Sequence, residues 1–317
     1  MAKFVLQMDA LHGLQPEGDT SVALGLAIQA RGHELFFCSP HTLVWQSGAL
    51  SAELAPLRLA DKARAWYQLG ALRRRRLDEM DCLLIRQDPP FDMAYITNLH
   101  LLESLARRVL VVNAPSGIAA APEKLLALKL YDALEDFLPP TLIARDKDAL
   151  TRFRAKHKDI VLKPLYGSGG AGVFRVRPRD DNFHAMVEQA LQQSPLPIMA
   201  QRYLPAIARG DKRVLLVDGE PAGAVNRLPP AGDVRANLHI GGRAEKARVD
   251  ATDRKMAAAL RPFLQSLGIW FAGLDVIGGL LTEINVTSPT GVRELKRLSG
   301  EDVAARLIGW IEQKLAQ

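Results

Sequence analysis

The chain has 317 residues, of which 48% are hydrophobic and 24% charged, with a formal net charge of +6. This length is too great for one small core and predicts two or three packed subdomains, and the composition is ordinary for a globular chain. The two cysteines, Cys38 and Cys82, cannot form a disulfide framework, and each belongs to an apolar run typical of a buried strand. No apolar stretch reaches membrane-spanning length, and the N-terminus lacks signal-peptide features. We therefore expect a cytoplasmic protein with no membrane partner.

The first third of the sequence alternates strand and helix patterns. A helix capped by Asp19 or Thr20 is expected to run through Ala30, and Asp92 caps a second helix. Short apolar strands are predicted at 3–8, 33–38, 81–86 and 109–112. Strands separated by helices predict a parallel α/β sheet, whose ligands gather at the carboxyl ends of the strands. Those ends are Asp9, Arg86 and Asn113.

The excess positive charge is concentrated at residues 73–76, four consecutive arginines in a segment that we predict to be a surface helix. No aromatic residues are interleaved, so a solvated face is favoured over a nucleic-acid surface. The other basic residues are scattered among glycine-rich loops, a distribution that suits small anions.

From Pro122 onward, helices alternate with antiparallel hairpins. The flanking strands are 159–163 with 173–176, 213–217 with 221–226, and 270–277 with 281–286. The last two hairpins turn at Asp218-Gly219 and Gly278-Gly279. We place a boundary near 120 and a softer one near 195, which gives three units: 1–121, 122–196 and 197–317.

A glycine loop at residues 167–172 fits the dinucleotide pattern G-x-G-x-x-G, but the residues after it alternate like a strand instead of opening a helix. A Walker loop is excluded because no Lys-Ser/Thr pair follows. The remaining interpretation is a hairpin flap over phosphates, as in kinases. Lys163 ends the preceding strand and could meet nucleotide phosphates, with Lys124 as a second candidate.

An acidic cluster is predicted on the last hairpin. Glu283 and Asn285 share one strand face, and such hard oxygen ligands suit Mg²⁺ together with substrate phosphates. A simple two-residue turn would send Asp275, on the partner strand, to the opposite face. We predict a bulged or longer turn that pairs Asp275 with Glu283, because the apolar residues of both strands then share one core face.

Four arginines complete the inventory. Arg213 starts a strand, and Arg227, Arg235 and Arg243 lie along a Gly/Pro-rich stretch that is too long for a hairpin turn. Loops of that length are commonly lids that exclude water. No Ser-His-Asp or Cys-His arrangement stands out, and the seven histidines lack metal-ligand spacing.

Several blocks together resemble the bacterial glutathione synthetases of the ATP-grasp superfamily. They are RQDPPFD at 86–92, KPL with the glycine loop from 163, GDKR at 210–213, DGEP at 218–221 and LTEINVTSPT at 281–290. The lysine, the glycine loop and Glu-x-Asn are shared across the superfamily, whereas RQDPPFD, GDKR and NVTSPT narrow the resemblance to this family. The sequence departs from the family at Ala10 and across 45–78.

The resemblance implies an N-terminal α/β domain, a central lid subdomain and a C-terminal ATP-grasp domain, with ATP between the last two. It implies a homo-oligomer, dimer or tetramer, and Mg²⁺, for which Mn²⁺ could substitute. Lys163 and Arg213 are the implied catalytic residues. Implied ATP contacts are Lys124, Lys163, Gly167, Ser168, Gly169, Gly170, Gln201, Tyr203 and Leu204. Implied substrate contacts are Arg86, Arg213, Arg227, Arg235, Arg243, Asn285 and Ser288. Implied metal ligands are Asp275, Glu283 and Asn285, and residues 228–244 form the mobile loop.

The implied reaction joins γ-glutamylcysteine to glycine through an acyl phosphate. Another carboxylate-amine ligase of the same fold, adding glutamate or joining D-alanine, is the nearest alternative. A non-catalytic ATP-binding regulator is the alternative from a different class.

Overall fold

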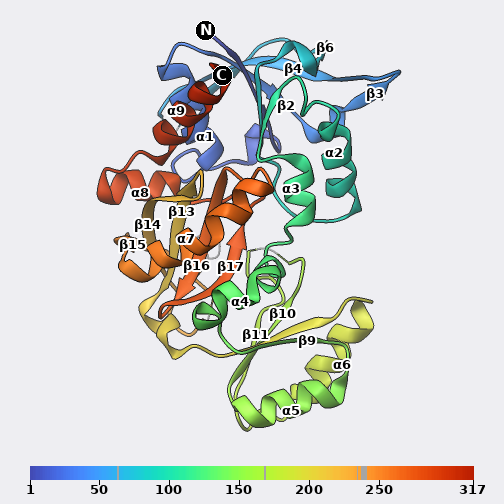
Figure 1. Cartoon of the computed structure of the whole chain (residues 1–317), viewed down its shortest axis with the longest axis vertical. Helices are drawn as coiled ribbons and strands as arrows, with labels where there is room; N and C mark the ends of the chain where they lie inside the picture. The colour runs from blue at the N-terminus through green and yellow to red at the C-terminus, as the bar shows by residue number, and fades with distance from the viewer. Residues whose placement is uncertain (63, 168, 234, 237–240) are drawn as a thin grey trace.

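This computed structural model describes residues 1–317 except 63, 168, 234 and 237–240. Three sheets follow one another along the long axis of the molecule, and each carries its own helices (Figure 1). Among the described residues, no helix is long and apolar enough to cross a membrane. The order of the sheets confirms the predicted fold class, an α/β part followed by antiparallel sheets.

The N-terminal sheet has the strand order β3-β4-β2-β1-β7-β8, with β5 and β6 also paired to β4. Its strands are β1 (Lys3–Gln7), β2 (Glu34–Cys38), β3 (Val44–Gln46), β4 (Ala49–Leu59), β5 (Tyr67–Leu69), β6 (Arg73–Arg76), β7 (Cys82–Ile85) and β8 (Leu110–Val112). Strands β2, β1, β7 and β8 are parallel, as the alternation of strands and helices predicts. The helices are α1 (Thr20–Ala30), α2 (Met93–Glu103) and α3 (Pro115–Ala120). Asp19 and Asp92 cap α1 and α2 through their side chains, as expected.

The arginine run at 73–76 is a strand, not the surface helix that we predicted. As β6 it pairs antiparallel with residues 51–54 of β4. Four identical residues carry no periodicity that distinguishes helix from strand, so pairing with a distant segment decides their conformation. Three of the four are exposed, which agrees with a solvated face, while Arg75 lies over the ring of Phe36. Charged residues on an edge strand also discourage pairing with other chains.

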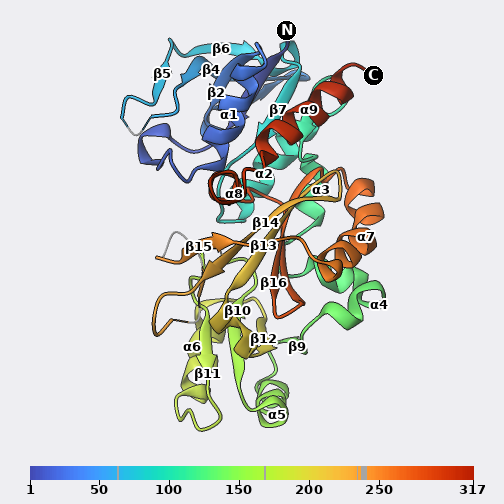
Figure 2. The same ribbon diagram turned by 90° about the vertical axis from the view of Figure 1, so that its left-hand side faces the viewer.

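The second sheet is small and has the antiparallel order β11-β10-β12-β9. Its strands are β9 (Thr141–Ala144), β10 (Ile160–Pro164), β11 (Phe174–Val176) and β12 (Ile198–Arg202), with helices α5 (Lys147–His157) and α6 (Phe183–Gln193). Its apolar core is separate from those of the rest of the molecule and includes Leu150, Leu162 and Phe183. This lid, as we call the described residues of 141–202, projects from the end of the molecule away from both termini (Figures 1 and 2). Short helical turns that include α4 (Tyr131–Leu134) lead into it.

The third sheet has the antiparallel order β15-β14-β13-β16-β17. Its strands are β13 (Asp211–Val217), β14 (Glu220–Leu228), β15 (Arg243–Lys246), β16 (Phe271–Ile277) and β17 (Leu280–Asn285). Its helices are α7 (Ala251–Ser266), α8 (Val292–Ser299) and α9 (Val303–Leu315). The predicted pairing of Asp275 with Glu283 is confirmed, because a register shift between Asp275 and Val276 displaces the ladder by one residue. Leu274, Val276, Ile284 and Val286 consequently share one buried cluster.

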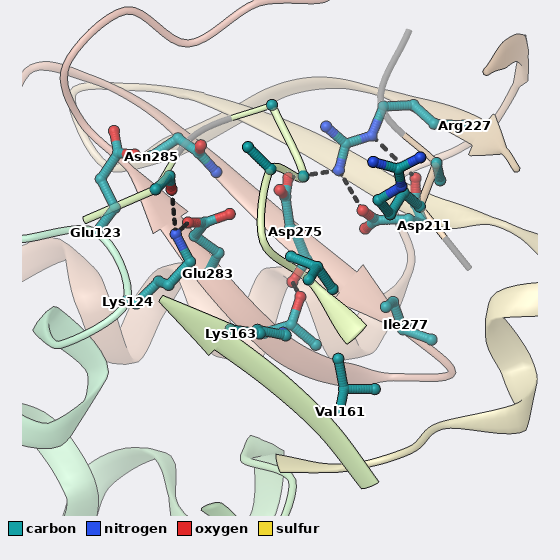
Figure 3. Close-up of a pocket in the computed structure, with 18 of the residues that line it drawn as sticks. Glu123, Lys124, Val161, Lys163, Asp211, Arg227, Asp275, Ile277, Glu283 and Asn285 are labelled. Carbon is teal, nitrogen blue, oxygen red and sulfur yellow. Dashed lines mark hydrogen bonds and ion pairs between the residues drawn. The ribbon is translucent and has the colours of Figure 1, made fainter. Parts of the chain in front are cut away.

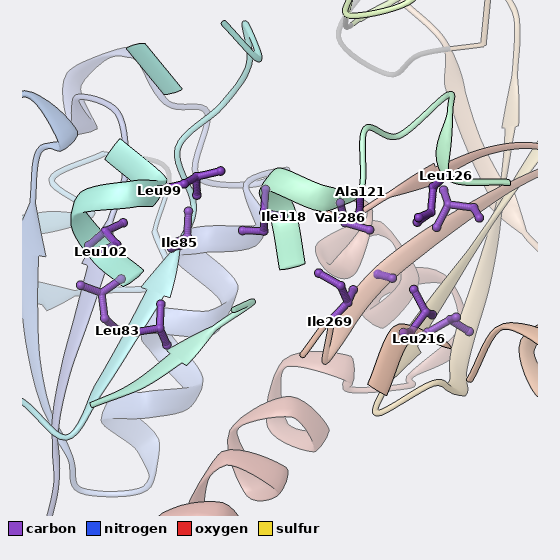
Figure 4. Packing of buried hydrophobic residues seen from close by; sticks show 14 of the residues in the cluster. Leu83, Ile85, Leu99, Leu102, Ile118, Ala121, Leu126, Leu216, Ile269 and Val286 are labelled. Atoms are coloured by element: carbon purple, nitrogen blue, oxygen red, sulfur yellow. The ribbon is translucent and has the colours of Figure 1, made fainter. Parts of the chain in front are cut away.

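The first and third sheets are joined through a continuous apolar core. One cluster runs from Leu83 and Leu99 of the N-terminal domain through Ile118 to Ile269 and Leu216 of the third sheet (Figure 4). Gly117 lies so close to this joint that a Cβ there would be 1.9 Å from the carbonyl oxygen of Leu267. The two domains therefore meet at a spacing that only glycine permits.

Two further features fasten these domains together. Asn113, at the carboxyl end of β8, donates to the carbonyls of Phe271 and Val286 and accepts from the amides of Trp270 and Phe271. Its side chain thus links the N-terminal domain to the third sheet through four hydrogen bonds. The C-terminal helix α9 packs beside α1 (Figures 1 and 2), where Glu312 pairs with Arg31 at 2.5 Å and His33 at 2.9 Å.

Cys38 and Cys82 are free and buried in β2 and β7, as predicted for strand thiols. Burial raises the pKa of Cys38 to about 12 and also raises that of Cys82. Both thiols are consequently kept protonated and unreactive.

Candidate active site

A cavity of about 440 Å³ lies between the lid and the third sheet (Figure 3). The predicted site residues that line it are Lys124, Lys163, Gly167, Gly169, Gly170, Gln201, Tyr203, Leu204, Arg213, Arg227, Arg235, Asp275, Glu283, Asn285 and Ser288. They come from both sides of the cavity and from loops that are distant in sequence. The fold therefore brings most of the predicted residues to one place.

Three predicted residues stand apart. Arg86 is buried at the end of β7, where it donates to Ser21 Oγ at 3.1 Å and to the carbonyl oxygen of Pro289 at 3.3 Å. Arg243 lies on the outer strand β15 and pairs with Glu245 at 2.7 Å in an exposed position. Neither side chain lines the cavity. Ser168 lies outside the described residues, as does part of the predicted mobile loop at 228–244.

Two lysines stand beside the glycine loop. Lys124 Nζ donates to the Gly167 carbonyl at 2.5 Å and lies 3.0 Å from Glu283 Oε1. Lys163, at the end of β10, donates to Gln201 Oε1 at 2.9 Å. Burial lowers the pKa of Lys163. An ammonium group whose hydrogen bond goes to a neutral amide is well disposed to receive an anion.

The acidic residues follow the predicted face of the hairpin. Asp275 and Glu283 are opposite each other on β16 and β17, and Asn285 follows on the same face as Glu283. Asn285 Nδ2 donates to the Gly273 carbonyl at 3.3 Å. Within the described part of the chain, no three His, Cys, Asp or Glu side chains form a metal-binding group.

The carboxylate of Asp275 is surrounded by arginines. It accepts from Arg213 Nε at 2.5 Å and Arg213 Nη2 at 3.0 Å, and Arg227 Nη2 lies 2.9 Å from its Oδ1. Arg227 also pairs with Asp211 at 2.5 Å. Burial raises the pKa of Asp275, but the two guanidinium groups outweigh burial and hold it well below its usual range. For Asp211 burial prevails over Arg227 and raises the pKa to about 6.

At the far side of the cavity, the end of β12 supplies Gln201 and Tyr203. Gln201 Nε2 donates to Thr141 Oγ1 at 3.0 Å, which fixes the amide that receives Lys163. The guanidinium carbon of Arg175 lies 3.6 Å from the centre of the Tyr203 ring, and Arg175 pairs with Asp159 at 2.6 Å. The Tyr203 ring is therefore held by a guanidinium group that an ion pair keeps in place.

Two residues of the site were missed in the sequence. Glu123 is partly buried at the cavity wall, and its Oε1 accepts from the amides of Val286 and Thr287 at 3.0 and 3.1 Å and from Thr287 Oγ1 at 2.8 Å. Burial and the nearby Glu283 raise its pKa. Asp211 was noted only as part of the GDKR block. Its pairing with Arg227 could have been found only by anticipating the register shift at Leu215/Leu216.

The fold is shared with solved ligases of low sequence identity. The D-cycloserine synthetase DcsG aligns with a TM-score of 0.69 at 16% identity, covering 98% of this chain and 99% of its own. The ATP-grasp ligase PsnB aligns with a TM-score of 0.63 at 18% identity, covering 99% of both chains. The chain therefore has the ATP-grasp fold.

Sequence relatives narrow the class to one family. The N-terminal domain of prokaryotic glutathione synthetase matches residues 2–119, and the ATP-grasp domain of the same family matches residues 123–300. A glutathione synthetase of Brucella melitensis is 45% identical over 96% of both chains, and one of Pseudomonas putida is 42% identical over 97% of this chain and 96% of its own. The chain belongs to the prokaryotic glutathione synthetase family.

Proposed function

We propose that the chain is a glutathione synthase, which ligates γ-L-glutamyl-L-cysteine to glycine and converts ATP to ADP and phosphate. The observation that carries this proposal is the full-length match to both domains of the family, combined with a cavity that holds two lysines, a glycine loop and an arginine cluster. A carboxylate is a poor acyl donor, because its leaving group would be oxide. Phosphorylation by ATP supplies a leaving group that an amine can displace.

In the first step the cysteine carboxylate attacks the γ-phosphorus of ATP and ADP departs. We propose that Lys124 and Lys163 neutralise phosphate charge. Both lysines line the cavity, and Lys124 also donates to the carbonyl of Gly167 in the glycine loop. The amides of Gly167, Gly169 and Gly170 would cover the phosphates, and residues 199–204 would carry the adenine. Gly169 and Gly170 have positive φ angles, 62° and 80°, which glycine adopts without strain.

In the second step the glycine nitrogen attacks the acyl carbon, the carbonyl oxygen becomes an oxyanion, and phosphate leaves. Arg213 would hold that oxyanion, because Asp275 fixes its guanidinium group at the cavity wall. Arg227, Arg235, Asn285 and Ser288 would contact substrate from the same cavity. Neither Arg86 nor Arg243 lines this cavity, so their substrate contacts stay predictions from the resemblance. We assign no general base for glycine.

The donor set fits a divalent cation. Glu283 and Asn285 present oxygen atoms at the cavity wall, and Asp275 adds a carboxylate whose oxygens it shares with two arginines. Mg²⁺ favours one or two carboxylates with phosphate oxygens, and Mn²⁺ accepts the same ligands. When bound, the ion would withdraw charge from the phosphate oxygens. Lys124 lies 3.0 Å from Glu283 Oε1 and balances its charge.

We also infer a cytoplasmic location and assembly into a homo-oligomer, dimer or tetramer. The free buried thiols of Cys38 and Cys82 agree with a reducing compartment. Neither a nucleic-acid nor a membrane partner is part of this proposal.

The decisive experiment measures phosphate release from ATP and Mg²⁺ with γ-glutamylcysteine, with and without glycine, and identifies the product by mass spectrometry. We expect glycine-dependent release and a tripeptide of glutathione mass. Activity with D-alanine or glutamate as acceptor, and none with glycine, would contradict the assignment and favour another ligase of the same fold. ATP binding without turnover of any pair would favour a regulator.

A matched pair of variants tests the site. Lys163→Met should reduce turnover about a hundredfold or more, the loss typical of one preorganised donor to developing charge. Lys147→Met removes a lysine from the same lid, where it pairs with Glu188 in an exposed position, and should leave turnover unchanged. Equal activity of the two variants would contradict the role of Lys163.

A further inference from the structure

An aromatic contact joins the N-terminal domain to the glycine loop of the lid. The rings of Phe91 and Tyr166 are stacked, with centroids 6.1 Å apart and planes within 6° of parallel. Phe91 belongs to the loop at 87–92, whereas Tyr166 immediately precedes Gly167. The two residues are far apart in sequence, so the contact exists only when the lid meets the N-terminal domain.

Phe91 stands on a rigid base. Its ring packs against the buried Tyr95 at 5.2 Å, and Asp92 caps helix α2 by accepting from the Tyr95 amide at 2.9 Å. Earlier in the same loop, the Asp88 amide donates to Asp9 Oδ2 at 2.8 Å. The base on which Tyr166 rests is therefore fixed to the N-terminal domain from several sides.

The same loop reaches the proposed dipeptide side of the cavity. Ser288 Oγ donates to Asp88 Oδ1 at 2.7 Å, and both residues line the cavity. The loop at 87–92 therefore contacts Ser288 at the cavity and Tyr166 beside the glycine loop.

The described glycines of the loop adopt backbone conformations that favour glycine. Gly169, Gly170 and Gly172 all have positive φ angles, and the backbone freedom that glycine allows must be given up when the loop covers phosphates. Lys124 holds the Gly167 carbonyl, and the stack on Tyr166 adds a contact at the start of the loop. A small cavity of about 20 Å³, bordered by Phe91, Leu165 and Tyr166, remains at this junction. Phe91 itself is partly buried and packs against the apolar core that joins the first and third sheets.

We propose that Phe91 and Tyr166 form an aromatic latch that positions the glycine loop over the nucleotide and couples nucleotide binding to binding at the dipeptide side. The latch rests on the proposed function only for the identity of the second ligand. Holding the loop in its bound conformation lowers the entropy cost of binding, so the latch should tighten nucleotide binding.

The first test is a double-mutant cycle on nucleotide affinity, measured by calorimetry with a non-hydrolysable ATP analogue and Mg²⁺ and without dipeptide. Phe91→Ala and Tyr166→Ala should each weaken binding about two- to tenfold, the range given by aromatic pairs. The double variant should be no weaker than either single variant, because the second ring has lost its partner. Additive losses, or no loss in Phe91→Ala, would overturn the latch.

Two controls separate the latch from general damage. Tyr166→Phe keeps the ring and should bind as the unaltered protein does. Phe174→Ala removes an exposed ring from the strand that follows the same glycine loop and should also leave binding unchanged. A loss in Phe174→Ala equal to that in Tyr166→Ala would assign the effect to the lid surface and overturn the proposal. Thermal denaturation establishes that each variant is folded.

The second test adds γ-glutamylcysteine. Saturating dipeptide should tighten nucleotide binding in the unaltered protein and should do so less in Phe91→Ala and Tyr166→Ala. Undiminished coupling in both variants would overturn the proposed link between the sites. If the dipeptide has no effect on the unaltered protein and glycine-dependent turnover is absent, the proposed function has failed, and the nucleotide-only cycle still decides the latch.

Discussion

Asp275 holds two buried guanidinium groups, and removing its charge should destabilise the protein strongly. The side chains of Asp275, Arg213 and Arg227 are only 7%, 6% and 6% exposed, so water can replace little of the lost interaction. In Asp275→Asn, Arg227 would keep its ion pair with Asp211, whereas Arg213 would lose the carboxylate that it contacts. Breaking a buried ion pair by removing one partner typically costs about 3–5 kcal/mol, and we expect a loss of that size.

The assay is urea unfolding at pH 7.5, followed by circular dichroism, without nucleotide or divalent metal so that ligand binding does not contribute. Asp218→Asn is the matched control. Asp218 accepts from Gln265 at 2.9 Å and lies 3.9 Å from Arg261, but its side chain is 26% exposed. The control should lose no more than about 1 kcal/mol. A loss in Asp275→Asn no greater than in the control would refute the reasoning, because it would mean that the arginines are adequately solvated in the cavity.

Further predictions concern three other positions. Burial raises the pKa of Asp211 from 3.8 to about 6. Because the folded protein then holds this proton more tightly than the unfolded chain does, the stability that it contributes is fully present below pH 4 and is lost as the pH rises through 6. Each pKa unit corresponds to about 1.4 kcal/mol, so the unfolding free energy of the unaltered protein should fall by roughly 3 kcal/mol relative to Asp211→Asn between pH 4 and 7, and a difference that is constant or grows with pH would contradict this. Glu123→Ala should weaken Mn²⁺ binding, measured by electron paramagnetic resonance, because the segment after β17 loses the carboxylate that accepts its hydrogen bonds. Glu123→Gln keeps an acceptor oxygen and should bind Mn²⁺ nearly normally. An equal loss of affinity in both variants would assign the effect to charge. Gly117→Ala should lower the melting temperature by several degrees, since a Cβ would be 1.9 Å from a backbone oxygen. In the control Gly13→Ala the new Cβ would have no atom within 4 Å, and the melting temperature should not change. Equal melting temperatures of the two variants would show that the packing between the domains adjusts at little cost.

Local signals were sufficient for much of the fold. Helices α1 and α2 each begin just after an aspartate whose side chain accepts a hydrogen bond from a backbone amide of the first turn. The glycine-marked turns lie where the three hairpins reverse direction. The pairing of Asp275 with Glu283 also followed from the sequence, because a one-residue slip would have turned Ile284 and Val286 away from the core. Strand edges and helix ends moved by only a residue or two.

Segments without a local pattern were decided by distant partners. The arginines at 73–76 form a strand because residues 51–54 of β4 offer them a ladder. Arg243 was grouped with the other arginines by its place in a long loop, yet the pairing of β15 with β14 carries it to an exposed edge. Neither outcome is visible in the residues themselves.

The sequence by itself determined which chemical groups are available, namely two lysines beside a glycine loop and a face of oxygen ligands on one hairpin. Their residue types and strand periodicity suffice for that, since alternation along a strand fixes which side chains share a face. Only the tertiary structure decided how those groups are held. Glu123 anchors β17 across 163 residues of chain, and Phe91 meets Tyr166 across a domain junction. Such contacts depend on the relative placement of whole domains, which is set by their common apolar core and by close approaches such as that of Gly117, and no local pattern encodes it.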